Sequence, residues 1–183
     1  MRGTYALSMP LDTVHGSLEA AGVALERADR DLRRLDELTR VLPDAANIRR
    51  SYDEVAHTYA NWLIWTRMVA VAINAAGEAA GKPEVFTTWW DDIALDEHHA
   101  FFWDSRNLAL KELAELIVDT PVRLDTGREV AYWAFDAGPF AAQPLLPRCQ
   151  QYTNWVYDAC LAPARELLWD WTRKELDAED AAA

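Results

Sequence analysis

The stretch Trp62-Leu-Ile-Trp-Thr-Arg-Met-Val-Ala-Val-Ala-Ile73 decides the fold. As a helix it carries apolar side chains on nearly every side, and Arg67 is its only charged residue. A helix that is apolar all round is buried all round, whereas a helix in a four-helix bundle normally keeps one face in water. We therefore expect connecting loops or a second copy of the chain to cover this helix.

The sequence on either side of this stretch predicts four helices, because long periodic segments alternate with clusters of Gly and Pro. Ser17 and Asp44 are suitable N-caps for the first two helices, and Gly77 is a suitable end for the second. Pro163 is expected to kink or break the last helix. The four helices are predicted over residues 18–42, 45–76, 90–118 and 148–177.

The predicted fold class is all-α, an antiparallel four-helix bundle. A chain of 183 residues with 51% hydrophobic residues fits one domain over 1–183. We expect an N-terminal arm at 1–16 and a disordered tail at 178–183. The third and fourth helices are joined by a long crossover at 119–147, which is partly extended and reads as a short β-hairpin around Asp125-Thr126-Gly127.

The charge balance excludes some classes of partner. Lys and Arg number 18 against 30 Asp and Glu, a net charge of −12, so we expect no DNA and no anionic membrane among the partners. No secretory signal and no membrane span is visible, and a cytoplasmic location is expected. Cys149 and Cys160 lie about 16 Å apart along one helix, too far for a disulfide, and are predicted to be free thiols.

Two carboxylate-x-x-His motifs raise the possibility of a metal centre. Glu54-Val-Ala-His57 and Asp96-Glu-His-His99 resemble the ligand spacing of di-iron bundles. If the second and third helices are antiparallel, the two histidines stand about 16 Å apart, too far for one site. We therefore expect no metal and no cofactor, and read Glu54 and His57 as a solvated or interface pair.

Arg106 is the most informative charged residue of the third helix. It lies within about 20° of the apolar stripe that contains Phe102, so it needs a carboxylate partner if it is buried. Two interpretations remain open: a structural ion pair that ties helices together, or an arginine that reads an anion or RNA. The candidate partners are Asp53, Glu54 and Glu166.

The window Ala100–Glu112 resembles the signature helix of HEPN-like all-α proteins. The similarity consists of an aromatic residue, Arg-Asn, and a Glu, which are Phe102, Arg106, Asn107 and Glu112 here. In ribonuclease members of that family, an Arg and a His act on RNA at a homodimer interface. The resemblance implies a helical fold and a site at Arg106 and Asn107, but Lys111 stands where catalytic members carry the His.

The leading functional hypothesis is a non-catalytic HEPN-like protein that acts through protein–protein contacts in defence or regulation. A homodimer through the second helix or its neighbours is expected, because isologous dimers are the commonest assembly. The residues expected to take part in binding are Trp103, Lys111, Glu54 and His57.

Two alternatives stay open. The first is a ribonuclease in which Arg106 and Asn107 work with a displaced histidine, His99 or His57, and only this alternative brings RNA as a partner. The second is a metal-binding four-helix bundle.

Overall fold

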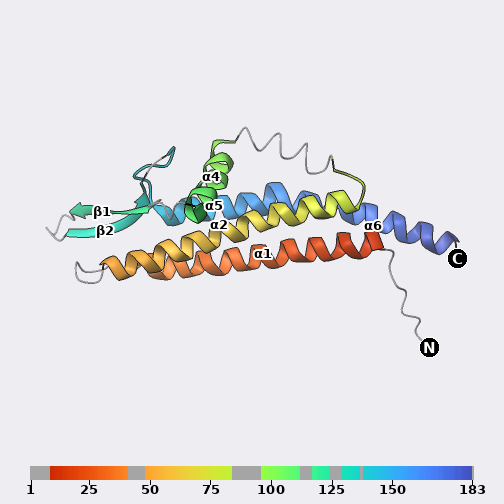
Figure 1. Ribbon diagram of the computed structural model, residues 1–183, viewed down its shortest axis with the longest axis horizontal. Helices are drawn as coiled ribbons and strands as arrows, with labels where there is room; N and C mark the ends of the chain where they lie inside the picture. The colour runs from red at the N-terminus through yellow and green to blue at the C-terminus, as the bar shows by residue number, and fades with distance from the viewer. Residues whose placement is uncertain are drawn as a thin grey trace, which may run out of the picture.

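The computed structural model describes residues 9–40, 48–83, 96–111, 117–123, 129–136 and 138–182; some side chains in these ranges, those of residues 106–111 among them, lie outside the description. The chain is mostly helical, as predicted (Figure 1). Its elements are α1 (Met9–Arg40), α2 (Ile48–Ala79), α4 (Glu97–Lys111), β1 (Ile117–Arg123), β2 (Glu129–Phe135), α5 (Leu145–Trp155), the π-helical segment η1 (Val156–Leu161) and α6 (Ala162–Ala182).

Helix α1 starts earlier than predicted, so the expected arm at 1–16 is wrong for residues 9–16. Leu11 and Val14 are fully buried and continue the apolar stripe of α1 toward the N-terminus. Pro10 is tolerated because it stands in the first turn, where its missing N–H has no intrahelical partner to lose. The signal was therefore present in the 3–4 spacing of Leu11, Val14 and Leu18.

Helix α2 ends later than predicted, at Ala79 rather than before Gly77. The stop is Gly81, which has φ +65° and so adopts the left-handed conformation that glycine tolerates best. The N–H of Lys82 donates to the carbonyl of Gly77 at 2.8 Å, and the N–H of Gly81 donates to that of Glu78 at 3.0 Å. This is the Schellman pattern of helix termination.

Helices α1 and α2 form a long antiparallel pair, and α5–η1–α6 lies along it as a third rod (Figure 1). Trp62 of α2 contacts Thr153, and Ala76 shares a small apolar cluster with Leu168. The later residue of α2 thus pairs with the later residue of the third rod, so the third rod runs parallel to α2. Helix α4 crosses these rods rather than running beside them (Figure 1). The predicted antiparallel four-helix bundle is therefore not confirmed.

A π-helical segment just before Pro163 divides the last helix into α5 and α6, in agreement with the predicted break. The helix begins at Leu145, so the predicted crossover at 119–147 is wrong for residues 145–147. Proline has no N–H to donate to the carbonyl four residues earlier, and its ring collides with that carbonyl. The wider turn of η1 avoids this collision: there the N–H of Ala162 donates to the carbonyl of Tyr157, five residues earlier. Helix α6 then continues to Ala182, so the predicted disordered tail is wrong for residues 178–182.

The strands of the predicted hairpin are present as the antiparallel pair β1–β2, with Ile117 opposite Phe135 and Arg123 opposite Glu129. The turn predicted at Asp125-Thr126-Gly127 lies outside the described residues. Ile117 and Val118, expected at the end of the third helix, belong to β1 instead. Both are β-branched, which favours a strand, and Pro121 three residues later disfavours a helix.

The core is built around an aromatic cluster contributed by α2, α4, β2, the following turn and α5. Trp62 lies near its centre, and its indole N–H donates to the Thr153 hydroxyl at 2.9 Å. Cys149 and Cys160 are buried near this cluster and free, as predicted. The members of the cluster are Tyr59, Trp62, Phe101, Phe102, Phe135, Phe140 and Tyr152.

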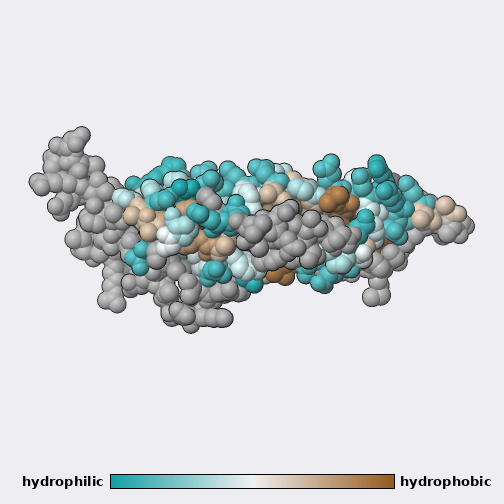
Figure 2. Space-filling model, turned by 90° about the horizontal axis from the view of Figure 1, so that it is seen from above, coloured by the Kyte–Doolittle hydropathy of each residue, from teal (hydrophilic) through white to brown (hydrophobic). Residues whose placement is uncertain are grey.

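The surface seen in Figure 2 is largely hydrophilic, with a few hydrophobic spots. Large apolar side chains are nevertheless exposed on α2, at Met68 (42%) and Val71 (47%), and on α6, at Leu167 and Trp169. Within the part of the chain that the structure describes, the apolar runs of the helices all fall short of what a bilayer crossing requires.

Candidate functional site

The candidate site begins at the N-terminus of α4, where Asp96 acts as the N-cap. Its Oδ1 accepts a hydrogen bond from the backbone N–H of His99 at 3.1 Å, and its carbonyl accepts one from Ala100 at 3.0 Å. A carboxylate at this position also suits the positive end of the helix dipole. The spacing Asp96-x-x-His99, considered above as a metal motif, is thus explained by helix capping.

His99 is enclosed by aromatic rings. It is only 3% exposed, and its Nδ1 lies 3.3 Å from the hydroxyl of Tyr152. The ring of Trp103 stacks on it at 5.5 Å between centroids, and that of Trp155 lies at 5.2 Å. His99 therefore lies on the buried side of α4.

The pKa of His99 is lowered to about 4, chiefly by burial; the positive charge of Arg67 adds to this shift, and the carboxylate of Asp96 opposes it. Burial also raises the pKa of its neighbour Tyr152 above the usual range. The imidazole is therefore neutral at physiological pH. An imidazole whose pKa is about 4 binds a proton weakly, so His99 is a weak general base.

Arg67 of α2 completes the stack. Its guanidinium carbon lies 3.5 Å from the ring centroid of Trp103, a close cation–π contact that links α2 to α4. Trp103, predicted as a binding residue, is thus engaged within the chain. We call this group the His99 stack; its members are Arg67, Trp103, His99, Tyr152 and Trp155. A cavity of about 140 Å³ beside it is lined by Asp96, Gln151, Tyr152 and Trp155.

Arg106, Asn107 and Lys111 fall in the last two turns of α4, and their side chains lie outside the described residues. Of the three carboxylates predicted to pair with Arg106, Glu54 lies 4.0 Å from Arg34 of α1, and Asp53 and Glu166 are exposed. The ion pair of Arg106 remains a prediction.

His57 and Glu54 lie on the exposed side of α2, next to α1. The imidazole of His57 is 3.2 Å from the amide of Asn61, and its charge helps to lower the pKa of Asp31, which burial raises overall. His57 is therefore an exposed residue at the edge of α2 next to α1, whereas His99 is buried against α5 and near Arg67 of α2. The structure does not join them in one site.

No metal-binding group of three or more His, Cys, Asp or Glu side chains is formed among the residues that the structure describes. The Glu54 carboxylate lies 4.0 Å from Arg34, and the His57 imidazole lies 3.2 Å from the amide of Asn61.

The structure also reveals a cavity of about 400 Å³ between α1 and the α5–η1–α6 rod, which the sequence did not indicate. It is lined by charged and aromatic side chains from both sides, among them Asp29, Tyr157, Asp158 and Arg165. The one sequence signal was Pro163, since the π-helical segment that it induces carries Tyr157 and Asp158. π-Helical turns often occur at functional sites.

Comparison with known proteins identifies no relative: no family model, no curated protein and no solved structure matches the chain.

Proposed function

We propose that this chain is a HEPN-like helical protein that does not cleave RNA and acts through protein–protein contacts, the first of which is with a second copy of itself. The proposal keeps the resemblance carried by Phe102, Arg106 and Asn107, and places the contact on α2.

A row of outward-facing residues on α2 carries the proposal. Their spacing alternates between four and three residues over three heptads, and this is the spacing by which one helix packs on another. Its middle is apolar, with Met68 and Val71 nearly half exposed in the single chain. We call this row the α2 seam; it consists of His57, Asn61, Ile64, Met68, Val71, Ala75 and Glu78.

The polar ends of the α2 seam favour an antiparallel arrangement of two copies. Centred near Met68, such a pair sets Ile64 opposite Val71 and His57 opposite Glu78, so a hydrogen-bond donor meets a carboxylate. A parallel pair sets Glu78 against its own copy, and like charges repel. An antiparallel pair is also what a two-fold axis perpendicular to the helix produces.

The exposed apolar residues of α6 are less suited to such a contact. Leu167 and Trp169 are two positions apart, so they point about 200° away from each other around the helix and form no common stripe.

The surroundings of His99 support the non-catalytic part of the proposal. A histidine acting on RNA must reach the sugar hydroxyl, and His99 is 3% exposed with a pKa of about 4. Lys111 is a poor substitute as a base, because its pKa would have to fall by several units.

Molar mass in solution tests the proposed contact. We expect the wild type to sediment as a dimer and Val71→Glu as a folded monomer, because the glutamate would be buried without a partner in the seam. Val23→Glu is the matched control, since Val23 is equally exposed (43%) but lies on α1. A wild type with the mass of one chain contradicts the proposal.

The ribonuclease alternative is tested separately. Purified protein is expected to leave a mixed RNA substrate intact. Cleavage by the wild type that is lost in Arg106→Ala contradicts the non-catalytic part of the proposal and restores Arg106 and Asn107 as catalytic residues.

A further inference from the structure

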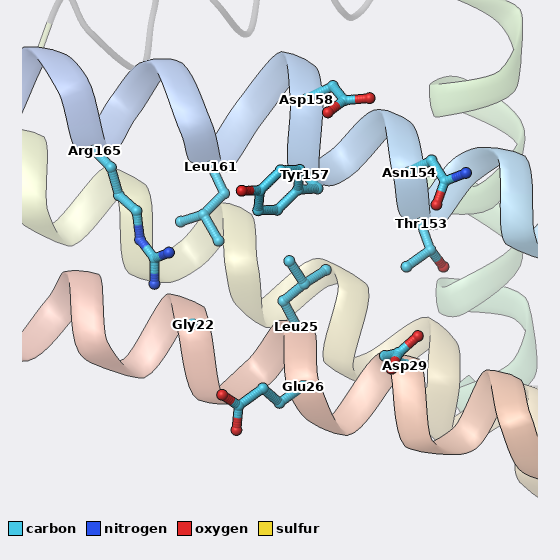
Figure 3. A pocket seen from close by; sticks show the side chains of 10 residues that line it. All are labelled: Gly22, Leu25, Glu26, Asp29, Thr153, Asn154, Tyr157, Asp158, Leu161 and Arg165. Carbon is cyan, nitrogen blue, oxygen red and sulfur yellow. The ribbon is translucent and has the colours of Figure 1, made fainter.

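The cavity between α1 and the α5–η1–α6 rod has the size of a small-molecule site. Its volume of about 400 Å³ falls within the usual range for ligand pockets. Figure 3 shows Leu25 of α1 and Leu161 of η1 pointing into the gap from opposite sides, with the ring of Tyr157 beside them. The middle of the cavity is therefore apolar.

The two ends of the cavity differ in charge. The guanidinium of Arg165 lies at one end, and Asp29, Asn154 and Asp158 lie toward the other (Figure 3). The carboxylate of Glu26, which also lines the cavity, extends along α1 toward the Arg165 end. Asp158 precedes Arg165 by seven residues, which corresponds to about 10 Å along a helix. The cavity thus has an apolar middle section about 10 Å long, with a cationic group at one end and anionic groups at the other.

Arg165 comes close to the backbone of α1 because residue 22 is glycine. A Cβ at Gly22 would lie 2.5 Å from the guanidinium nitrogen Nη2 of Arg165. The absence of a side chain at this one position lets the arginine fold over the end of the cavity.

The polar groups at both ends are available to a ligand. Among the side chains that the structure describes, Arg165, Asn154 and Asp158 form no hydrogen bond or ion pair with one another or with a neighbour. Their contacts are thus left to solvent or to a bound molecule, while Asp29 shares its charge with Arg33 at 2.6 Å.

We propose that this cavity binds a small elongated zwitterion, with a carboxylate on Arg165, an ammonium or guanidinium group toward Asp158 and Asn154, and an aliphatic body against Leu25, Leu161 and Tyr157. Each part of the ligand then meets a complementary part of the cavity. The proposal is independent of the α2 seam, because none of the cavity residues belongs to α2.

Calorimetric titration with three probes of one chain length tests this proposal. 6-Aminohexanoate carries both charges, hexanoate only the anion and hexylamine only the cation. We expect 6-aminohexanoate to bind at least about tenfold more tightly than either single-charge probe, because both ends contribute a charge-assisted contact.

Arg165→Ala is expected to remove this preference and leave 6-aminohexanoate binding no better than hexylamine. Arg173→Ala is the matched control, since Arg173 lies two turns further along α6 and pairs with Asp170 at 3.0 Å. Circular dichroism and thermal unfolding check that both variants fold. Equal affinity for the three probes, no binding of any probe, or equal effects of the two substitutions would overturn the proposal.

Discussion

The two faces of α2 carry similar apolar side chains at similar spacing, but only one of them is covered by this chain. The inner face presents Tyr59, Trp62 and Ile73, all fully buried by side chains from α1, β2 and α5. The outer face presents the α2 seam, where Met68 and Val71 remain nearly half exposed. The difference teaches that an all-round apolar helix need not be central to its own chain. Its second face is available for another molecule.

The largest effect is expected on the inner face. Trp62→Ala should lower the free energy of unfolding by about 3–5 kcal/mol, because it leaves a cavity in the aromatic cluster and removes the hydrogen bond to Thr153. Chemical denaturation measures this loss. A change below about 1 kcal/mol would mean that the inner face is no better packed than the outer one.

The second effect is a pH dependence set by His99. Its pKa is about 4 in the folded chain against an ordinary 6.5, so the unfolded chain takes up the proton first as the pH falls. The stability contributed by the neutral imidazole is complete above pH 6.5 and is lost progressively toward pH 4, by about 3 kcal/mol in total.

Urea unfolding of the wild type and His99→Gln between pH 7 and pH 4.5 isolates this contribution from that of the carboxylates. The wild-type curve should fall more steeply than that of the variant. Parallel curves would show that His99 is not enclosed as described.

A smaller effect is expected at the boundary between the two faces, where Arg67 stands next to Met68. Arg67→Ala should cost about 1–2 kcal/mol, because it removes the cation–π contact with Trp103. Trp fluorescence during thermal unfolding reports on the loss. Arg67→Lys should recover part of it, and failure of both substitutions to lower the midpoint would remove the link between α2 and α4.

The smallest effect is expected far from either face. Arg33→Ala should change the free energy of unfolding by no more than about 0.5 kcal/mol, since its ion pair with Asp29 is exposed. A loss comparable to that of Arg67→Ala would show that surface charge contributes more to this acidic chain than its geometry indicates.

Local patterns predicted most of the elements. Pro163 indicated the division between α5 and α6, and Asp125-Thr126-Gly127 indicated the hairpin. The boundaries were less certain, because Gly77 is tolerated inside α2 until Gly81 supplies the positive φ, and Leu11 extends α1 past the proposed cap at Ser17. The directions of the helices depend on long-range packing, and no local pattern reports that α5 runs parallel to α2.

The candidate site was predictable only in part, because the sequence does not report long-range packing. The sequence named His99 as a candidate site residue, and the structure buries it. The rings of Tyr152 and Trp155 that enclose it come from α5, and Arg67, which stacks on Trp103, comes from α2, all far away in sequence. The cavity beside η1 was not predictable, since it arises where a π-helical turn meets a glycine of another helix.

The most direct test of the account is disulfide trapping across the proposed two-fold axis. Met68→Cys places one thiol of each copy at the centre of the antiparallel α2 pair, whereas Val23→Cys places an equally exposed thiol on α1. Both native cysteines are buried. Under mild oxidation, non-reducing electrophoresis should show a covalent dimer of Met68→Cys and a monomer of Val23→Cys. A monomer of Met68→Cys, or equal dimer from both variants, would contradict the α2 seam as the contact between copies.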